Sequence, residues 1–264
     1  MKYRPCSTPT DSPVEELPLV YRDDYLVAVH KPSGLLVHRS PIDRHETRFA
    51  LQLVRDQLGQ WVYPVHRLDK PTSGLLLFAL SPDIAAHLSQ QFAAHSVRKA
   101  YLAVVRGYCP GQGVIDHPIT DKPDRLGDCD RVQPSPAQSA RTTFRCLATV
   151  ELPCAVDRYP SSRYSLVALF PLQGRRHQLR RHMKHIGHPV IGDAKYGKGV
   201  HNRFFRERFG SDRLLLACAR LEIVHPQSGQ ALVLGASLEG SFADLVDRLG
   251  WTDAVQLFME SRMV

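Results

Sequence analysis

The residues best suited to chemistry lie in the stretch His66–Gly74, which reads HRLDKPTSG. It places Asp69 beside a Pro-Thr-Ser-Gly turn, directly before the apolar run Leu75–Leu80. A carboxylate at the lip of a buried strand is either a turn residue that bonds its own backbone or a reactive group held toward a substrate. The residue types elsewhere in the chain bear on which of these two roles applies.

A basic stretch, Gly174–Gly187, supplies a second candidate group and contains no acid (GRRHQLRRHMKHIG). On a helix with about 100° per residue, Leu179, Met183 and Ile186 form a narrow apolar stripe. Arg180 falls at the edge of this stripe, so its guanidinium is expected to lie sideways between core and solvent. That is the position from which a guanidinium can pair with a carboxylate in a cleft.

Three other cations of this helix are candidates for binding substrate. Arg176 and Lys184 flank Arg180 at four-residue spacing. Arg181 falls on the opposite side and is expected to contact solvent or phosphate. The stretch also holds four histidines, at positions 177, 182, 185 and 188, but their spacing fits no regular zinc pattern and no cysteine is near. We therefore expect no metal, and expect the histidines to pack or to contact phosphate.

The distribution of charge favours a nucleic-acid partner. The chain has 264 residues and a formal net charge of +8. Between Arg158 and Arg220 there are 14 Lys and Arg against 3 acids, whereas the remaining residues hold 20 basic and 23 acidic groups. A positive field concentrated in one segment is typical of a surface that binds a polyanion.

Composition excludes several other classes of protein. The six cysteines form no CxxC pair, and no apolar stretch approaches the length of a membrane span. The N-terminus has no apolar core of a signal peptide. We expect reduced thiols, no membrane association and a cytoplasmic protein.

Strand patterns dominate the chain, and helices are interspersed among them without a regular βαβ rhythm. This pattern predicts an α+β domain built on a mainly antiparallel mixed sheet with flanking helices. The predicted strands are 25–31, 75–80, 98–107, 141–150, 163–172 and 213–225, and the predicted helices are 47–59, 81–96, 174–187 and 241–249. Thr47 and Ser81 are the expected N-caps of the first two helices, and the last helix is expected to close the chain.

The chain is expected to form a single catalytic domain over residues 18–264. Residues 1–17 are rich in Pro, Ser and Thr and are predicted to be a flexible tail. Residues 110–138 are polar and hold five prolines, which predicts a long irregular loop insertion.

The stretch HRLDKPTSGLLLFALS resembles the signature of the RluA-type pseudouridine synthases. The resemblance extends to three further motifs in the same chain order, from about Leu19 to Leu238. They are VAVHKPSGLLVH, RKAYLAVVRG and GRRHQLRRHMKHIGHPVIGDAKYG. It implies the pseudouridine synthase fold with a central RNA-binding cleft, and it implies an isomerase that needs no cofactor.

The resemblance also assigns roles to individual residues. It makes Asp69 the catalytic aspartate and Arg180 the arginine that pairs with it. Arg67 would help to displace the target base, and Leu179 would pack beside that base. Tyr101 would stack on the uracil and is the candidate for moving a proton. His66 is expected to order the loop.

These residue types suit the reaction that the resemblance implies. The enzyme would break the N1–C1′ bond, turn the uracil and rejoin it through C5, so no atom enters or leaves. Positive charge builds at C1′, where a carboxylate can attack it or stabilise it. That carboxylate must stay ionised in a partly dry pocket, and a guanidinium in contact favours the charged form. The covalent aspartyl route and the glycal route both remain open.

The resemblance favours tRNA as the substrate, with uridine 65 as the target. The short tail leaves no room for an extra RNA-binding domain, and the stretches VHRSPIDR and ATVELPCAVDRYPSSRYSLVAL support the same choice. The alternatives are a synthase for 23S ribosomal RNA and a non-catalytic RNA-binding protein of the same fold. A serine hydrolase is disfavoured because PTSGL is not a GxSxG elbow. We expect the protein to act as a monomer.

Overall fold

The computed structural model describes residues 16–39, 45–120 and 136–262. Their contacts divide the chain into two compact units: unit 1 comprises the chain up to Val97 together with Glu222–Ala236, and unit 2 comprises Arg98–Leu221 and the chain from Ser237. The single catalytic domain expected from sequence stays a prediction. Most of the predicted tail lies outside the described residues, but Leu17 is buried and its N–H donates to Gln57 Oε1 at 3.1 Å. Its position is therefore fixed.

Unit 1 contains a small antiparallel sheet with a buried centre. Strand β2 pairs with β1 on one side and with β4 on the other, and β3 also pairs with β4. The strands are β1 (Leu19–Arg22), β2 (Leu26–Lys31), β3 (Tyr63–Pro64) and β4 (Ser73–Ala79). Strand β10 (Ala231–Gly235) also belongs to unit 1, and it pairs with β9 (Leu216–Val224). Every residue of β2 and of β4 is buried, which accounts for the continuous apolar run from Leu75 to Ala79 in β4.

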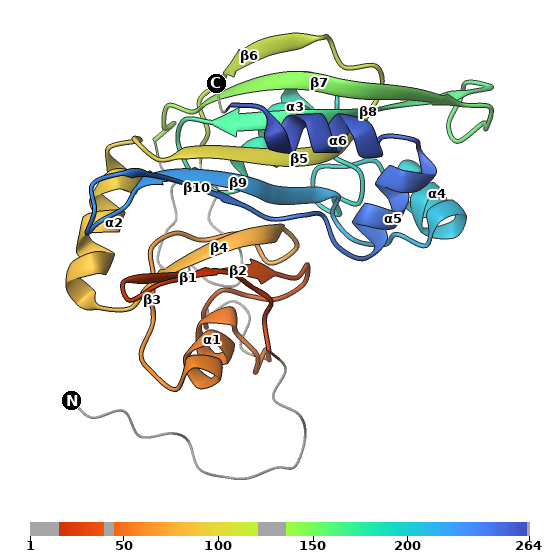
Figure 1. Cartoon of the computed structure of the whole chain (residues 1–264). Helices are drawn as coiled ribbons and strands as arrows, with labels where there is room; N and C mark the ends of the chain where they lie inside the picture. Colours follow the sequence, from red (N-terminus) through yellow and green to blue (C-terminus); the bar gives the residue numbers. More distant parts are fainter. Residues whose placement is uncertain (1–15, 40–44, 121–135, 263–264) are drawn as a thin grey trace, which may run out of the picture. The chain divides into compact units, whose positions relative to one another are not determined.

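Among its described residues, unit 1 has the helices α1 (Ala50–Leu58) and α2 (Pro82–Ala93). Figure 1 shows α1 on one side of β1, β2 and β4. The Ser81 hydroxyl accepts the N–H of Ile84 at 3.3 Å, so the predicted cap of α2 is confirmed. The predicted cap of α1 is wrong: the helix begins after Phe49 without a side-chain cap. The N–H groups of Ala50 and Leu51 donate instead to the carbonyl groups of Leu36 and Val37.

Unit 2 contains a larger sheet in the strand order β9-β5-β8-β7-β6. Its strands are β5 (Arg98–Arg106), β6 (Gln112–Asp116), β7 (Arg141–Leu152), β8 (Ser162–Pro171) and β9 (Leu216–Val224), the last of which runs into unit 1. The pairs β5–β8, β7–β8 and β6–β7 are antiparallel. Strand β6 lies within the stretch 110–138, for which an irregular insertion was expected, so residues 112–116 are regular; residues 121–135 of that stretch lie outside the described residues. Its residue Ile115 is buried, and Gly113 lies close to the ring of Phe144.

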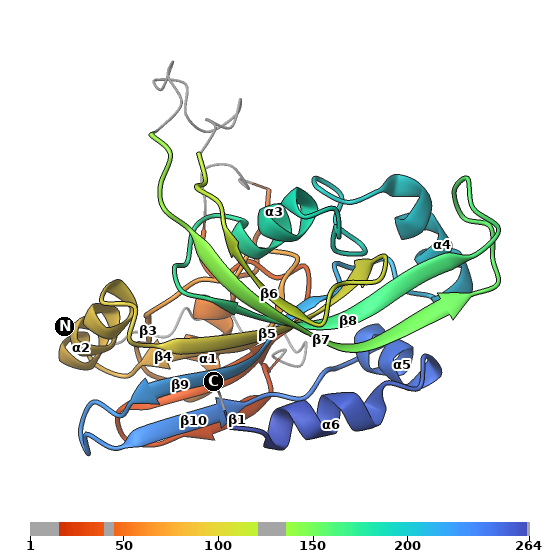
Figure 2. The same ribbon diagram turned by 90° about the horizontal axis from the view of Figure 1, so that it is seen from above.

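The helices of unit 2 cover both faces of its sheet. They are α3 (Gln178–His185), α4 (Gly199–Phe209), α5 (Ser241–Arg248) and α6 (Thr252–Glu260). Figure 2 shows α3 and α6 on opposite sides of the strands. Met183 of α3 packs with Ala103 of β5, whereas Phe258 of α6 packs with its neighbour Leu102. Successive side chains of a strand point to opposite faces, which accounts for the two layers.

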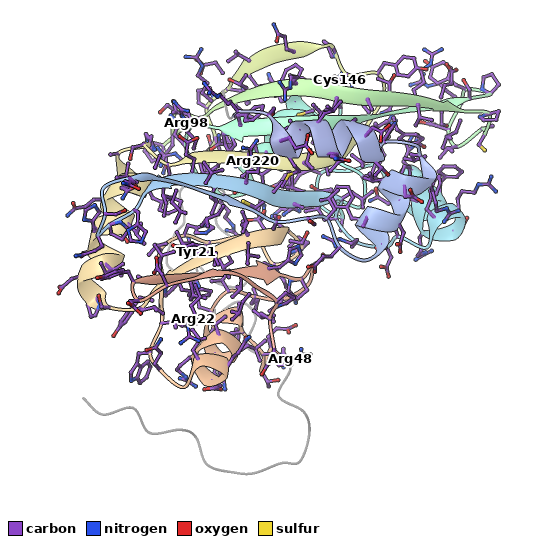
Figure 3. All side chains as sticks on the ribbon, in the orientation of Figure 1. Tyr21, Arg22, Arg48, Arg98, Cys146 and Arg220 are labelled. Carbon is purple, nitrogen blue, oxygen red and sulfur yellow. The ribbon has the colours of Figure 1, made fainter. Side chains whose placement is uncertain are left out.

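Helices α4 and α6 were not expected from sequence, and α6 follows the helix that was expected to close the chain. Arg220 of β9, labelled in Figure 3, holds the C-terminal end of α6. Its Nη1 donates to the carbonyl oxygens of Phe258 at 3.1 Å and Ser261 at 2.5 Å. A cation at this end satisfies carbonyl groups that have no partner within the helix.

A buried histidine of α4 makes the stability of the protein sensitive to acid. His201 is 4% exposed, its Nδ1 shares a hydrogen bond with the hydroxyl of Tyr164 at 2.9 Å, and its Nε2 has no partner among the described residues. Burial, together with the charge of Arg106, lowers the pKa of His201 from 6.5 to about 4. The unfolded state therefore binds more protons between these values, so stability falls as the pH drops below 6.5.

We expect this histidine alone to lower the free energy of unfolding by about 2 kcal/mol between pH 7 and pH 5. Urea unfolding at both pH values, for the wild type and for His201→Gln, measures the effect. The variant should lose that part of the pH dependence. His87→Gln, a change in an exposed histidine of α2, is the matched control and should keep it. An identical pH dependence in wild type and His201→Gln would contradict the assignment.

Candidate active site

Asp69 lies in a tight turn between β3 and β4. Its backbone carbonyl accepts the N–H of Thr72 at 2.9 Å, which closes the turn over Lys70 and Pro71. Thr72 and the following strand are buried, whereas the Asp69 side chain is half-buried. The backbone carbonyl group of Asp69 thus closes this turn.

Lys31, at the end of β2, binds the backbone of this turn. Its side chain is 0% exposed, and its Nζ donates to the carbonyl oxygens of Leu35 at 2.7 Å, Pro32 at 2.9 Å and Lys70 at 3.1 Å. The N–H of Gly34 donates to the same Lys70 carbonyl at 2.9 Å. The HKPSG stretch, which sequence analysis gave no role of its own, therefore holds the backbone beside Asp69.

Two neighbours of Asp69 have contrasting environments. The His66 Nε2 accepts the N–H of Leu77 at 3.0 Å, and its ring stacks on Phe92 with a centroid distance of 5.0 Å. His66 thus orders the loop, as expected. Arg67 is exposed. Burial of His38 and the charge of Arg67 together lower the pKa of His38.

We expect Lys31→Met to lower the free energy of unfolding by about 2–4 kcal/mol, because the carbonyl groups of Pro32 and Leu35 lose this donor, whereas that of Lys70 retains the Gly34 N–H. Thermal unfolding should show a decrease in Tm of roughly 5–10 °C. Lys70→Met is the matched control for stability, since the Lys70–Glu46 ion pair (2.8 Å) is partly exposed and should contribute less than about 1 kcal/mol. An unchanged Tm for Lys31→Met would contradict the supporting role.

In unit 2, Tyr101 lies on β5 opposite Leu169 of β8. It is half-buried and packs against an apolar cluster that includes Leu179 and Met183 of α3. Two of the residues that the resemblance selected, Tyr101 and Leu179, therefore share one cluster. The Tyr101 hydroxyl also acts to lower the pKa of the buried Cys218 thiol. Burial still raises the pKa of Cys218 to about 12, against the effects of Tyr101 and of the Lys99 charge.

Helix α3 is shorter than the basic stretch suggests. His177, immediately before Gln178, has φ 55° and ψ 25°, a left-handed conformation that ends the helix on this side. Its Nδ1 lies 3.0 Å from the hydroxyl of Tyr196, and the two groups share a hydrogen bond. Arg176 therefore lies outside the helix, and the expectation that it flanks Arg180 on the same helical face is wrong. It is exposed in the preceding loop.

Arg180 is more deeply buried than its place at the edge of the stripe suggested, with 6% of its surface exposed. Its Nε donates to Asp193 Oδ2 at 2.7 Å and its Nη2 to Asp193 Oδ1 at 2.9 Å. Burial alone would raise the pKa of Asp193, but the hydrogen bonds and charge of Arg180 and the N–H groups of Tyr196 and Lys195 lower it. Arg180 therefore has an ionised carboxylate partner within unit 2.

Asp193 is a residue that sequence reasoning missed. The available signal was an acid between Gly192 and Ala194 in the GDAKYG segment, directly after a basic helix that has no acid of its own. The expected pairing of Arg180 with Asp69 joins residues of different units and stays a prediction.

Two cations of α3, Arg180 and Lys184, lie near one aromatic ring. The Lys184 Nζ is 5.9 Å from the centroid of the Tyr196 ring, and the guanidinium carbon of Arg180 is 5.3 Å from it. Lys184 is exposed. Arg181 is half-buried, and its Nη2 donates to the carbonyl oxygen of Thr120 at 3.0 Å; the expected contact with solvent or phosphate stays a prediction.

The histidines near α3 have structural partners. His182 is fully buried, its Nδ1 bonds the Thr142 hydroxyl at 2.9 Å, and its Nε2 bonds the carbonyl oxygen of His117 at 3.0 Å. His188 Nδ1 bonds the carbonyl oxygen of Arg106 at 2.9 Å. Within the described residues, no group of three or more potential ligands could hold a metal ion.

Within the same residues, no helix has the length and apolar character that a membrane span requires.

Comparison with known proteins gives one consistent result. Residues 25–185 match the family described as RNA pseudouridylate synthase. The tRNA pseudouridine synthase C of Vibrio cholerae is 48% identical over 239 residues, which cover 90% of this chain and 98% of that protein. The protein of the same name from Pasteurella multocida is 48% identical over 235 residues, with 89% and 97% coverage.

Solved structures confirm the expected fold class, an α+β protein with a mixed sheet and flanking helices. Human RNA Pseudouridylate Synthase Domain Containing 4 matches with a TM-score of 0.65 and 25% identity, covering 88% of this chain and 93% of that one. Human RNA Pseudouridylate Synthase Domain Containing 1 matches with a TM-score of 0.63 and 26% identity, covering 90% and 96%. From its fold and its sequence alike, the chain belongs to the RNA pseudouridylate synthase family.

Proposed function

We propose that this chain converts uridine 65 of tRNA into pseudouridine. The observation that carries the choice of tRNA is the 48% identity to tRNA pseudouridine synthase C of Vibrio cholerae over 90% of the chain. The choice of position 65 rests on the motif resemblance. As a member of its family the chain is an isomerase, and the reaction adds and removes no atoms, so the proposal includes no cofactor.

Asp69 is the proposed reactive carboxylate. The Lys31 ammonium and the Gly34 N–H both bind the Lys70 carbonyl, one residue further along the chain. A carboxylate whose neighbouring backbone is fixed in this way meets C1′ of the ribose without first having to be ordered. It either forms a bond to C1′ or stabilises the positive charge that develops there when the N1–C1′ bond breaks.

Residues of unit 2 are proposed to receive the extruded base. The uracil must leave its stack, at a cost of a few kcal/mol. Tyr101 provides an aromatic face on which it can stack, and Leu179 of the same cluster would pack beside it. Arg67 is exposed and would occupy the space that the base leaves. Arg180 is proposed to donate to Asp69 and to keep it ionised, in a central cleft that binds the RNA.

Two alternatives differ from this proposal in the RNA or in the chemistry. A 23S ribosomal RNA synthase would share all four motifs. It is disfavoured by the identity to enzymes named for tRNA. A non-catalytic RNA-binding protein would be expected to lack one of Asp69, Tyr101 and Arg180, yet all three are present. The proposal also places the protein in the cytoplasm as a monomer.

Lys184, an exposed cation of α3, is proposed to bind phosphate rather than to take part in the reaction. We expect Lys184→Ala to weaken tRNA binding by roughly 3–10-fold and to reduce the slope of log Kd against log salt concentration by about 0.7–0.9. The single-turnover rate constant at saturating tRNA should change by less than about twofold. Filter binding at several salt concentrations and rapid-quench assays measure both quantities. A lower rate with unchanged binding would contradict the phosphate role.

Mapping of pseudouridines in total RNA tests the proposed function. Cells with and without this gene are compared by carbodiimide labelling and primer extension. Loss of the signal at position 65 of tRNA, with ribosomal RNA unchanged, is the expected result. Loss of a signal in 23S ribosomal RNA would favour the first alternative, and no change at any site would favour the second.

A further inference from the structure

Two glycines restrict the backbone of the turn that carries Asp193. Gly192 has φ 79°, and a Cβ placed on it would overlap the carbonyl oxygen of Arg213. A Cβ on Gly197 would overlap the carbonyl oxygen of Asp193. The turn therefore requires glycine at both ends.

A side chain from α4 binds the backbone on both sides of Asp193. The Asn202 Oδ1 accepts the N–H of Gly192 at 2.9 Å, and its Nδ2 donates to the carbonyl oxygen of Asp193 at 3.0 Å. One carboxamide thus satisfies a donor and an acceptor of the turn at the same time. Helix α4 is connected in this way to the residue that binds Arg180.

The Asp193 carboxylate is fully occupied by donors. Its side chain is 0% exposed and accepts from Nε and Nη2 of Arg180. Its Oδ1 also accepts the N–H groups of Lys195 and Tyr196, each at 2.9 Å. Four donors on one carboxylate leave it little freedom to move, and the ring of Tyr196 lies 5.3 Å from the guanidinium carbon. The plane and direction of the Arg180 guanidinium are therefore fixed.

The pairing with Asp193 has two consequences for Arg180. The two parallel hydrogen bonds to Asp193, called the fork below, use the Nε–Nη2 edge of the guanidinium, so the N–H groups of Nη1 point away from Asp193. The ionised Asp193 also cancels the net charge of Arg180, so Arg180 acts on another carboxylate mainly through directed hydrogen bonds. Because directed hydrogen bonds depend on geometry, a misoriented Arg180 guanidinium should lower the reaction rate even though its charge is unchanged.

We propose that Asp193 and Asn202 are positioning residues that hold the guanidinium of Arg180 in its reactive direction. This inference rests on the role proposed above for Arg180. Neither residue needs to touch the substrate. Asn202 holds the turn, the turn holds the Asp193 carboxylate, and the carboxylate orients the Arg180 guanidinium.

A double-mutant cycle tests the proposal. In Asp193→Asn, the new NH₂ group faces the Nε–H of Arg180, so the fork breaks. We expect the single-turnover rate constant at saturating tRNA to fall roughly 30-fold, with the Kd for tRNA changed by less than about twofold. In an Arg180→Lys background, which cannot form the fork, the same change should cost less than about twofold. General destabilisation would lower the rate by the same factor in both backgrounds.

Asn202→Asp provides a second, milder variant. It keeps the acceptor for Gly192 but places an oxygen against the carbonyl of Asp193. We expect a roughly 5–10-fold lower rate that again disappears in the Arg180→Lys background. Asp157→Asn is the matched control, because Asp157 forms an exposed ion pair with Lys198 at 3.1 Å. Its rate should stay within about twofold of the wild type.

A spectroscopic readout separates this proposal from the proposed function. The Arg180 Nε–H should give a slowly exchanging ¹⁵N–¹H signal that shifts or broadens in Asn202→Asp and not in Asp157→Asn. An unchanged signal, or equal rate losses in both backgrounds, would overturn the positioning role. If no pseudouridine forms in tRNA, the proposed function fails, while the signal still tests the geometry. If Asp193→Asn does not fold, the Asn202→Asp cycle gives the result.

Discussion

Asp69→Asn should abolish pseudouridine formation while tRNA binding stays within about tenfold of the wild type. The amide has nearly the same size but carries no charge, so it can neither bond C1′ nor stabilise positive charge there. We expect a rate loss of at least about 10⁴-fold, as for removal of a nucleophile in other enzymes. Phosphate contacts supply most of the affinity for RNA and are unchanged. Release of tritium from 5-tritiated uridine in tRNA measures turnover, and filter binding measures affinity.

The fold of this variant should persist. The turn at Asp69 is closed by its backbone carbonyl and the Thr72 N–H, and the Lys31 ammonium binds the carbonyl of Lys70. None of these bonds uses the Asp69 carboxylate. Asp56→Asn, a change in a carboxylate that pairs with Arg55 on α1 at 3.0 Å, is the matched control and should react normally. Measurable turnover by Asp69→Asn would remove Asp69 from the catalytic role.

The elements around Asp69 could be predicted because their signals are local. The Ser81 cap and Pro82 define the start of α2, and the continuous apolar run before Ser81 defines β4. The apolar stripe of α3 was also visible from its spacing, and Leu179 and Met183 are buried as expected. The spacing of apolar residues along the chain indicates which face of a helix or strand is buried, and it depends only on nearby residues.

The parts that sequence reasoning missed depend on residues that are distant in the chain. The start of α3 is set by the left-handed His177, whose ring bonds Tyr196 at a separation of 19 residues. The partner of Arg180 within unit 2 is Asp193, 13 residues away, in a turn that Asn202 completes. No periodicity marks such pairs, since the choice of partner depends on how the turn packs.

The helices that were missed lack the usual start signals. Helix α4 begins at Gly199 and α6 at Thr252, and neither has a side chain that caps its first turn. Helix α4 also carries three arginines among its apolar residues. Its buried face consists of His201 and Phe205. Tertiary packing rather than intrinsic propensity accounts for both helices.

Tyr101→Phe should lower the single-turnover rate by roughly 10²–10⁴-fold if the hydroxyl moves a proton, the range found for general acid–base groups. The ring stays, so stacking of the uracil and packing against the Leu179 cluster should persist. The Kd for tRNA is therefore expected to change by less than about threefold. The variant also removes the hydroxyl that interacts with the buried Cys218, which should lower the free energy of unfolding by about 1 kcal/mol at most.

Tyr108→Phe is the matched control for this variant, because it removes a tyrosine hydroxyl that donates to Glu151 at 2.9 Å on the surface. Its rate should equal that of the wild type. Tyr101→Ala separates the two proposed roles, since it removes the ring as well and should weaken the capture of the base. If Tyr101→Phe reacts at the wild-type rate while Tyr101→Ala is slow, Tyr101 acts as a stacking platform only. The proton of C5 must then leave through another group.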